Sequence, residues 1–101
     1  MPFQLDSPMY YTYVLVSSTN GKWYKGATSD LKARPLEHER GEVTSTRFRP
    51  PLGLVYYEAC LDAADAYRRE RYLKTGRGKR YLRQRMRSWQ AQINQKKLER
   101  H

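Results

Sequence analysis

Aromatic and β-branched residues are concentrated in two short segments near the start of the chain. They make up most of residues 10–17 and include Trp23 and Tyr24 of the second segment, and the two segments flank Thr19-Asn20-Gly21. Asn-Gly between two such runs is the strongest short-range signal of a β-hairpin. The pattern therefore predicts paired strands at Tyr10–Ser17 and Lys22–Ala27, which would hold Tyr13 and Tyr24 close together.

After the hairpin, the pattern changes to helical spacing. Ser29 or Asp30 can act as the N-cap of a helix that runs to about Arg40 and ends before Gly41. Pro35 lies beyond the first turn of this helix, where a proline removes a backbone hydrogen bond and crowds the preceding turn. We expect a kink or an irregular start there.

The second half of the chain predicts one more strand and two helices. Leu52–Glu58 is apolar enough to be a central strand. Asp62 is a candidate N-cap for a helix over Ala63–Thr75, with Gly76 as its left-handed stop. A last helix should run from about Lys79 towards Lys97. The predicted fold class is α+β, a small three-stranded antiparallel or mixed sheet flanked by helices in the order ββαβαα.

The composition indicates one small basic domain. The chain has 101 residues and a formal net charge of +10, from twenty Lys and Arg against ten Asp and Glu. Such an excess points to a polyanionic partner, with nucleic acid favoured over an acidic membrane surface. We expect residues 1–9 to form a disordered leader, 10–88 the domain, and 89–101 a helical extension or tail.

The cysteine count and the hydropathy of the chain indicate its cellular location. Cys60 is the single cysteine, so no intramolecular disulfide and no cysteine-based zinc cluster can form. The chain does not open on a signal-peptide pattern, and no apolar run approaches the ~20 residues that cross a membrane. These features predict a cytoplasmic protein without a membrane partner.

Two tripeptides, Tyr11-Thr12-Tyr13 and Tyr24-Lys25-Gly26, begin a series of short motifs along the chain. They resemble the paired tripeptides that name the GIY-YIG nuclease superfamily. The later segments that match, in chain order, are Thr28–Arg34, Glu37-His38, Leu54–Glu58 and Arg69–Lys74. The likeness covers roughly residues 10–88 and is strongest to small single-domain bacterial members, which are similar to the nuclease domain of the excision-repair C subunit.

The resemblance implies a role for five residues. Tyr13 would activate or orient the attacking water, and Tyr24 would contact that water or the scissile phosphate. Arg34 would hold the phosphate and stabilise transition-state charge, while His38 would bond to a catalytic tyrosine. Glu70 would be the single acidic ligand of one divalent cation, Mg²⁺ or Mn²⁺, which keeps much of its hydration shell.

Three features depart from the superfamily pattern. The first tripeptide lacks its Gly and Ile, and Pro35 interrupts the helix between Arg34 and His38. Gln84 occupies the late position that is usually Asn. Without the resemblance, Tyr13 and Tyr24 would be read as cross-strand packing, and Glu70 as a solvated residue or an i,i+4 partner of Lys74.

Basic residues around the proposed site predict a nucleic-acid-binding surface. Its expected members are Lys25, Arg47, Arg49, Arg77, Lys79, Arg80, Arg83 and Gln84. The sequence thus predicts a metal-dependent DNA endonuclease of low sequence specificity in the bacterial cytosol or nucleoid, acting in repair or recombination. Branched or structured DNA is a possible substrate. The alternatives are a non-catalytic basic module that keeps the fold, and a less favoured RNA-directed or ribosome-associated binder.

Overall fold

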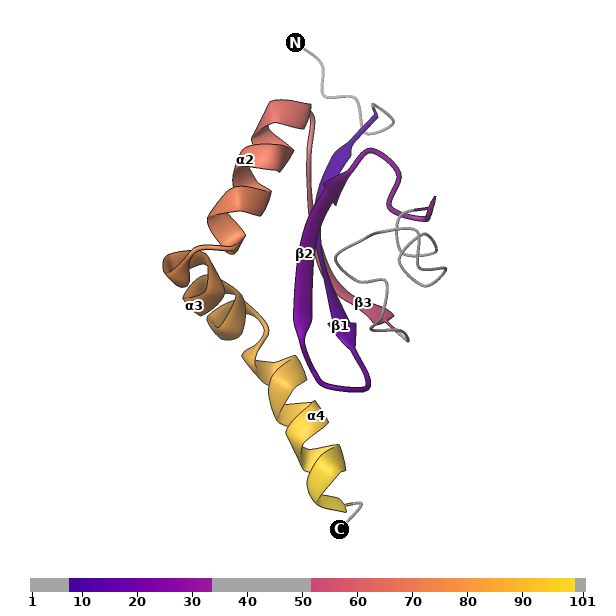
Figure 1. Cartoon of the computed structure of the whole chain (residues 1–101), viewed down its shortest axis with the longest axis vertical. Helices are drawn as coiled ribbons and strands as arrows, with labels where there is room; N and C mark the ends of the chain where they lie inside the picture. The colour runs from indigo at the N-terminus through magenta and orange to yellow at the C-terminus, as the bar shows by residue number, and fades with distance from the viewer. Residues whose placement is uncertain (1–7, 34–51, 100–101) are drawn as a thin grey trace. The chain divides into compact units, whose positions relative to one another are not determined.

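The computed structural model describes residues 8–33 and 52–99. It contains three strands, β1 (Tyr10–Ser17), β2 (Trp23–Thr28) and β3 (Leu52–Cys60). Three helices follow, α2 (Ala63–Leu73), α3 (Gly76–Arg85) and α4 (Arg87–Glu99) (Figure 1). All the pairings are antiparallel. The fold is therefore α+β, as the sequence predicts.

The chain divides into two compact units, one ending at Arg71 and the other beginning at Tyr72. We call the described residues 8–33 and 52–71 the sheet unit, and residues 72–99 the helical unit. The predicted helix after Asp30 lies mostly outside the described residues, and its first helical position is Ala33.

The predicted hairpin is confirmed. β1 and β2 pair from Tyr11↔Thr28 to Val16↔Trp23. Gly21 has a φ of +71°, which a glycine adopts without the steric cost of a side chain. The turn closes because the Ser17 backbone N–H donates to the Lys22 carbonyl at 2.9 Å. Asn20 accepts through Oδ1 from the Lys22 N–H at 2.9 Å, so the Asn-Gly signal sets the turn locally.

The central strand is β1, and the expectation that the third strand would be central is wrong. The sheet order is β2-β1-β3, so among the described strands β1 bonds on both sides while β3 has one neighbour. In β3, Tyr57 is 53% exposed and Leu54 is 40% exposed. A run of apolar residues shows only which side chains a strand carries. Whether the strand is central or at an edge of the sheet depends on the strands that pair with it. The β1–β3 register also shifts between Val14 and Leu15.

The two faces of the sheet have different coverings. Tyr13, Leu15 and Leu52 form a buried cluster on one face, which we call the tyrosine face. Thr12 and Val14 are also buried and point to the opposite face, because side chains alternate along a strand. The Thr12 hydroxyl donates to the Ala66 carbonyl of α2 at 2.9 Å. We therefore call the face with Thr12 the α2 face.

Asp62 caps α2, as predicted. Its Oδ1 accepts from the Ala64 N–H at 2.8 Å and from the Asp65 N–H at 3.3 Å. A side-chain acceptor of this kind satisfies backbone donors that the first helical turn leaves without partners.

The end of α2 and the helices that follow correct the prediction. Gly76 is the first residue of α3, rather than a left-handed stop, and Gly21 is the only described residue with positive φ. Thr75 caps α3 by accepting through Oγ1 from the Gly78 N–H at 3.1 Å. The single last helix expected from about Lys79 begins earlier and is divided at Met86. No Gly or Pro marks that break, so composition could not predict it.

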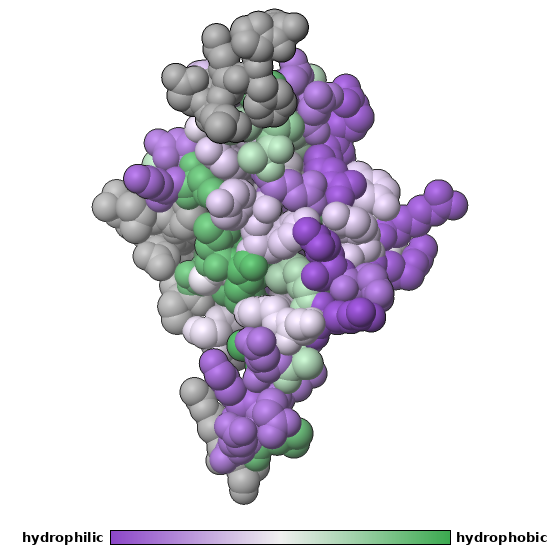
Figure 2. All heavy atoms as spheres, turned by 180° about the vertical axis from the view of Figure 1, so that it is seen from behind, coloured by the Kyte–Doolittle hydropathy of each residue, from purple (hydrophilic) through white to green (hydrophobic). Residues whose placement is uncertain are grey.

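Gly78 explains how α3 can begin so soon after α2. A Cβ placed on Gly78 would overlap the Tyr72 carbonyl oxygen and the Leu73 Cα. Leu82 and Met86 are buried further along the helical unit, whereas α4 has no buried residue. Figure 2 shows the surface of α4 as largely hydrophilic. Among the described residues, no helix combines the length and apolar character needed to span a membrane.

Candidate functional site

The two motif tyrosines lie on the same face of the sheet. Tyr13 pairs with Gly26 across the hairpin, and Tyr24 pairs with Leu15. Because Tyr13 and Leu15 are two residues apart, their side chains and those of their partners share one face. Tyr13 is 1% exposed, and the half-buried Tyr24 packs against the cluster that contains it.

Gly26 determines how the Tyr13 ring lies. A Cβ placed on Gly26 would overlap the Oη and Cζ atoms of Tyr13. The ring therefore lies flat across the Gly26 backbone, which a residue with a side chain would prevent. Since β2 is an edge strand of the described sheet, the phenol of Tyr13 extends towards that edge. This contact gives a structural reason for the glycine of the second tripeptide.

The segment after β2 starts on the tyrosine face. Leu31 packs against the buried cluster there. Asp30 accepts through Oδ1 from the Lys32 N–H at 3.1 Å and from the Ala33 N–H at 3.0 Å, which is the bonding expected of an N-cap. Arg34 follows at once, but Arg34, Pro35 and His38 lie outside the described residues.

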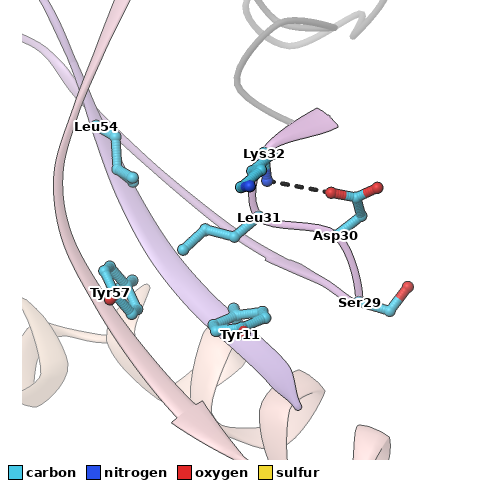
Figure 3. Close-up of a pocket in the computed structure, with 7 residues that line it drawn as sticks. All are labelled: Tyr11, Ser29, Asp30, Leu31, Lys32, Leu54 and Tyr57. Atoms are coloured by element: carbon cyan, nitrogen blue, oxygen red, sulfur yellow. Dashed lines mark hydrogen bonds between the residues drawn. The ribbon is translucent and has the colours of Figure 1, made fainter. Parts of the chain in front are cut away.

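A separate pocket of about 660 Å³ opens on the same face of the sheet unit. Its lining residues are Tyr11, Ser29, Asp30, Leu31, Lys32, Leu54 and Tyr57 (Figure 3). Leu31 points towards Leu54 and Tyr57, and the Tyr11 and Tyr57 rings meet edge to face at 5.8 Å between centroids. Neither Tyr13 nor Tyr24 lines this pocket, so it is not the place where the motif tyrosines would act.

Glu70 belongs to α2, which packs on the face of the sheet opposite to the motif tyrosines. Its side chain is half-buried and engaged with neighbouring groups. The described residues thus place Tyr13 and Tyr24 on one face and the helix of Glu70 on the other. A site that uses all three must lie at an edge of the sheet, where groups from both faces can meet.

The donor chemistry at Glu70 fits one hard divalent cation. Within residues 8–33 and 52–99, no group of three or more His, Cys, Asp or Glu side chains is positioned to enclose a metal ion. Mg²⁺ is usually bound by one or two carboxylates and retains several waters, so a cage of protein ligands is unnecessary. A single carboxylate at Glu70 is compatible with that mode.

An ion pair beside Glu70 was not predicted from the sequence. Arg69 donates through Nε to Glu58 Oε1 at 2.8 Å and through Nη2 to Glu58 Oε2 at 3.1 Å. Tyr56 donates through its hydroxyl to Glu58 Oε2 at 2.9 Å. Glu58 and Arg69 are eleven residues apart, and their meeting depends on how α2 packs on β3. Neither secondary-structure propensity nor helical periodicity in the sequence can predict such a pair.

The basic residues expected to bind nucleic acid are distributed unevenly. Arg77, Lys79, Arg80, Arg83 and Gln84 all lie on α3 and are exposed. Lys25 is half-buried on β2, and Arg47 and Arg49 lie outside the described residues. Within the helical unit the basic residues are Lys74, Arg77, Lys79, Arg80, Arg83, Arg85, Arg87, Lys96 and Lys97, against Glu99 as the single acidic residue.

Comparison with protein families defines the class. The family model described as the GIY-YIG catalytic domain matches residues 9–81. The match includes the hairpin, α2 and the first half of α3. The chain therefore belongs to the GIY-YIG family, a nuclease superfamily, which confirms the resemblance seen in its motifs.

The chain is also similar to several curated UPF0213 proteins. One from Desulfotalea psychrophila is 34% identical over 73 residues, which cover 70% of this chain and 66% of the relative. One from Lacticaseibacillus paracasei is 39% identical over 66 residues, covering 64% and 73%. One from Staphylococcus aureus strain Mu3 is 35% identical over 72 residues, covering 70% and 84%. The search of solved structures found no significant match.

Proposed function

We propose that this protein is a divalent-metal-dependent endonuclease that hydrolyses phosphodiester bonds in DNA. The supporting observation is the Tyr13–Gly26–Tyr24 arrangement in a chain of the GIY-YIG family. Gly26 is the residue that lets the Tyr13 phenol lie across the β2 backbone. Plain cross-strand packing of two tyrosines would not require a glycine at that position.

The proposed roles follow from what the hydrolysis needs. Tyr13 orients the attacking water and relays its proton, and Tyr24 contacts the water or the scissile phosphate. Arg34 pairs with the phosphate oxygens, whose charge grows in the transition state. His38 hydrogen-bonds a catalytic tyrosine. Glu70 holds one Mg²⁺ or Mn²⁺, which would supply electrostatic stabilisation of the phosphoryl oxygens when bound.

The proposed binding surface is mainly α3. Arg77, Lys79, Arg80 and Arg83 project from a helix without acidic residues and would contact DNA phosphates, with Gln84 beside them. Lys25, Arg47 and Arg49, which are outside the helical unit, would make further phosphate contacts of their own. Contacts to phosphates hold DNA without reading its sequence, so we propose low sequence specificity.

The second candidate is a DNA-binding module that has kept the fold without the activity. It is favoured by one observation, the nine basic residues and single acidic residue of the helical unit described above. That charge would bind a polyanion whether or not the tyrosines are active. Plasmid nicking distinguishes the two candidates.

The experiment compares wild-type protein with Glu70→Gln and Arg34→Ala on supercoiled plasmid with Mg²⁺ or Mn²⁺. We expect nicking by the wild type and a loss of about 100-fold or more in each variant, the size usual for removing a transition-state stabiliser. Asp65→Asn, on the exposed side of α2, is the matched control and should nick like the wild type. Equal nicking by all four proteins would indicate contamination and overturn the proposal. Retarded migration of DNA without cleavage would support the binding module.

A further inference from the structure

Two anchors attach α2 to the sheet. The first is the buried bond from the Thr12 hydroxyl to the Ala66 carbonyl, and the second is the forked Arg69–Glu58 ion pair. Thr12 and Glu58 are direct cross-strand partners on β1 and β3. Ala66 and Arg69 are three residues apart, so they lie on the same side of the helix. The two anchors are thus side by side on the sheet and one turn apart on α2.

The Arg69–Glu58 anchor is unusually well defined for an ion pair. Both carboxylate oxygens accept from the guanidinium, and Tyr56 holds one of them from the same strand. The Arg69 and Glu58 side chains are 33% and 26% exposed, whereas the neighbouring Arg68–Asp65 pair is 67% and 59% exposed. A two-bond fork between planar groups restricts orientation as well as distance.

Glu70 directly follows Arg69, so the rotation of α2 sets the direction of its carboxylate. Side-chain ends lie about 5–6 Å from a helix axis, and a rotation of about 10° moves them by about 1 Å. A displacement of that size in a catalytic group can reduce the rate by about 100-fold. A cavity of about 210 Å³ beside Glu58 and Arg69 leaves room for α2 to move if the anchor is weakened.

We infer that Arg69 and Glu58 are positioning residues for Glu70. Tyr56 supports them by holding the Glu58 carboxylate. The pair fixes the rotation of α2 against β3, and this rotation sets the direction of the Glu70 carboxylate. The inference rests on the proposed function, because it assigns the pair a role through Glu70. It predicts that variants of the pair lose more free energy of transition-state stabilisation than free energy of unfolding.

The test uses Arg69→Lys, which keeps the charge but loses the planar fork, and Glu58→Gln, which keeps the volume but loses the charge. Arg68→Lys makes the same chemical change one residue away, on the exposed pair. Measurements are kcat and KM for plasmid nicking, the thermal midpoint, and Mn²⁺ affinity of DNA-free protein by electron paramagnetic resonance. We expect kcat to fall at least about 10-fold in both pair variants. Mn²⁺ affinity should fall, while KM stays within about two-fold.

Arg68→Lys should match the wild type in every measurement. If the pair variants keep wild-type kcat and Mn²⁺ affinity while Glu70→Gln is inactive, the positioning role is overturned and the proposed function stands. If Glu70→Gln nicks like the wild type while Arg34→Ala does not, the role of Glu70 as metal ligand fails, and this inference fails with it. If Arg69→Lys does not fold, Glu58→Gln decides between these outcomes. A lower thermal midpoint with unchanged kcat and Mn²⁺ affinity would show a structural role alone.

Discussion

The sheet unit and the helical unit differ most in charge. The described residues of the sheet unit nearly balance their charges. Its basic residues are Lys22, Lys25, Lys32, Arg68, Arg69 and Arg71, against Asp30, Glu58, Asp62, Asp65 and Glu70. The helical unit has nine basic residues and one acidic residue.

The units also use their side chains differently. In the sheet unit the motif tyrosines are packed against other residues, and the Glu58–Arg69 ion pair is partly shielded from water. The basic residues of α3 are exposed. Packing fixes the position of a group, whereas exposure leaves a charge available to a partner. The difference suggests that the sheet unit would supply the precise geometry of the reaction, and the helical unit would supply affinity for the substrate.

We expect the largest change in activity from Tyr13→Phe, which tests the difference in role between the two units. The change removes only a hydroxyl, so the ring can still lie across Gly26. We expect nicking to fall by about 100-fold or more, as is typical when a group that moves a proton is lost. Binding of DNA in EDTA, measured by gel shift, should not change. A parallel loss of binding would show that the tyrosine face contributes to DNA affinity. It would contradict the assignment of affinity to the helical unit.

An intermediate effect is expected from changing Arg77, Arg80 and Arg83 together to Gln. DNA affinity at moderate salt should fall by about 10- to 100-fold, and the slope of log affinity against log salt should flatten by up to about 3. At saturating DNA, kcat should remain near the wild-type value. The matched control changes Arg87, Lys96 and Lys97 on α4 together to Gln, which removes the same number of charges outside the proposed surface. Equal losses in both proteins would mean that net charge matters and that α3 is not a distinct surface.

The smallest effect is expected from Gly26→Ala, and it tests the packing within the sheet unit. The added methyl would overlap the buried Tyr13 ring. Forcing an extra methyl into a filled space costs about 1–3 kcal/mol in the free energy of unfolding. Gly53→Ala is the matched control, because a Cβ there has no atom within 4 Å. Denaturant unfolding measures both. Equal stability of the two variants would contradict the ring position.

Local chemistry explains which features could be predicted from sequence. Asn20-Gly21 predicts its own turn, and Asp62 predicts the start of α2, because each acts on backbone groups within a few residues. The family motifs likewise occur at set distances along the chain. The expected helix stop at Gly76 is wrong because a glycine near a helix end is compatible with a stop or a start. Thr75 decides between them by capping α3.

The sequence by itself therefore determined the hairpin, the α+β class, the family and the basic character of the last helices. Tertiary structure alone decided that β1 is the central strand, that Tyr13 lies across Gly26, and that Glu58 meets Arg69. Each of these depends on which surfaces pack together. The free energy of such packing is shared among residues far apart in the chain, so no local pattern of residues can encode it.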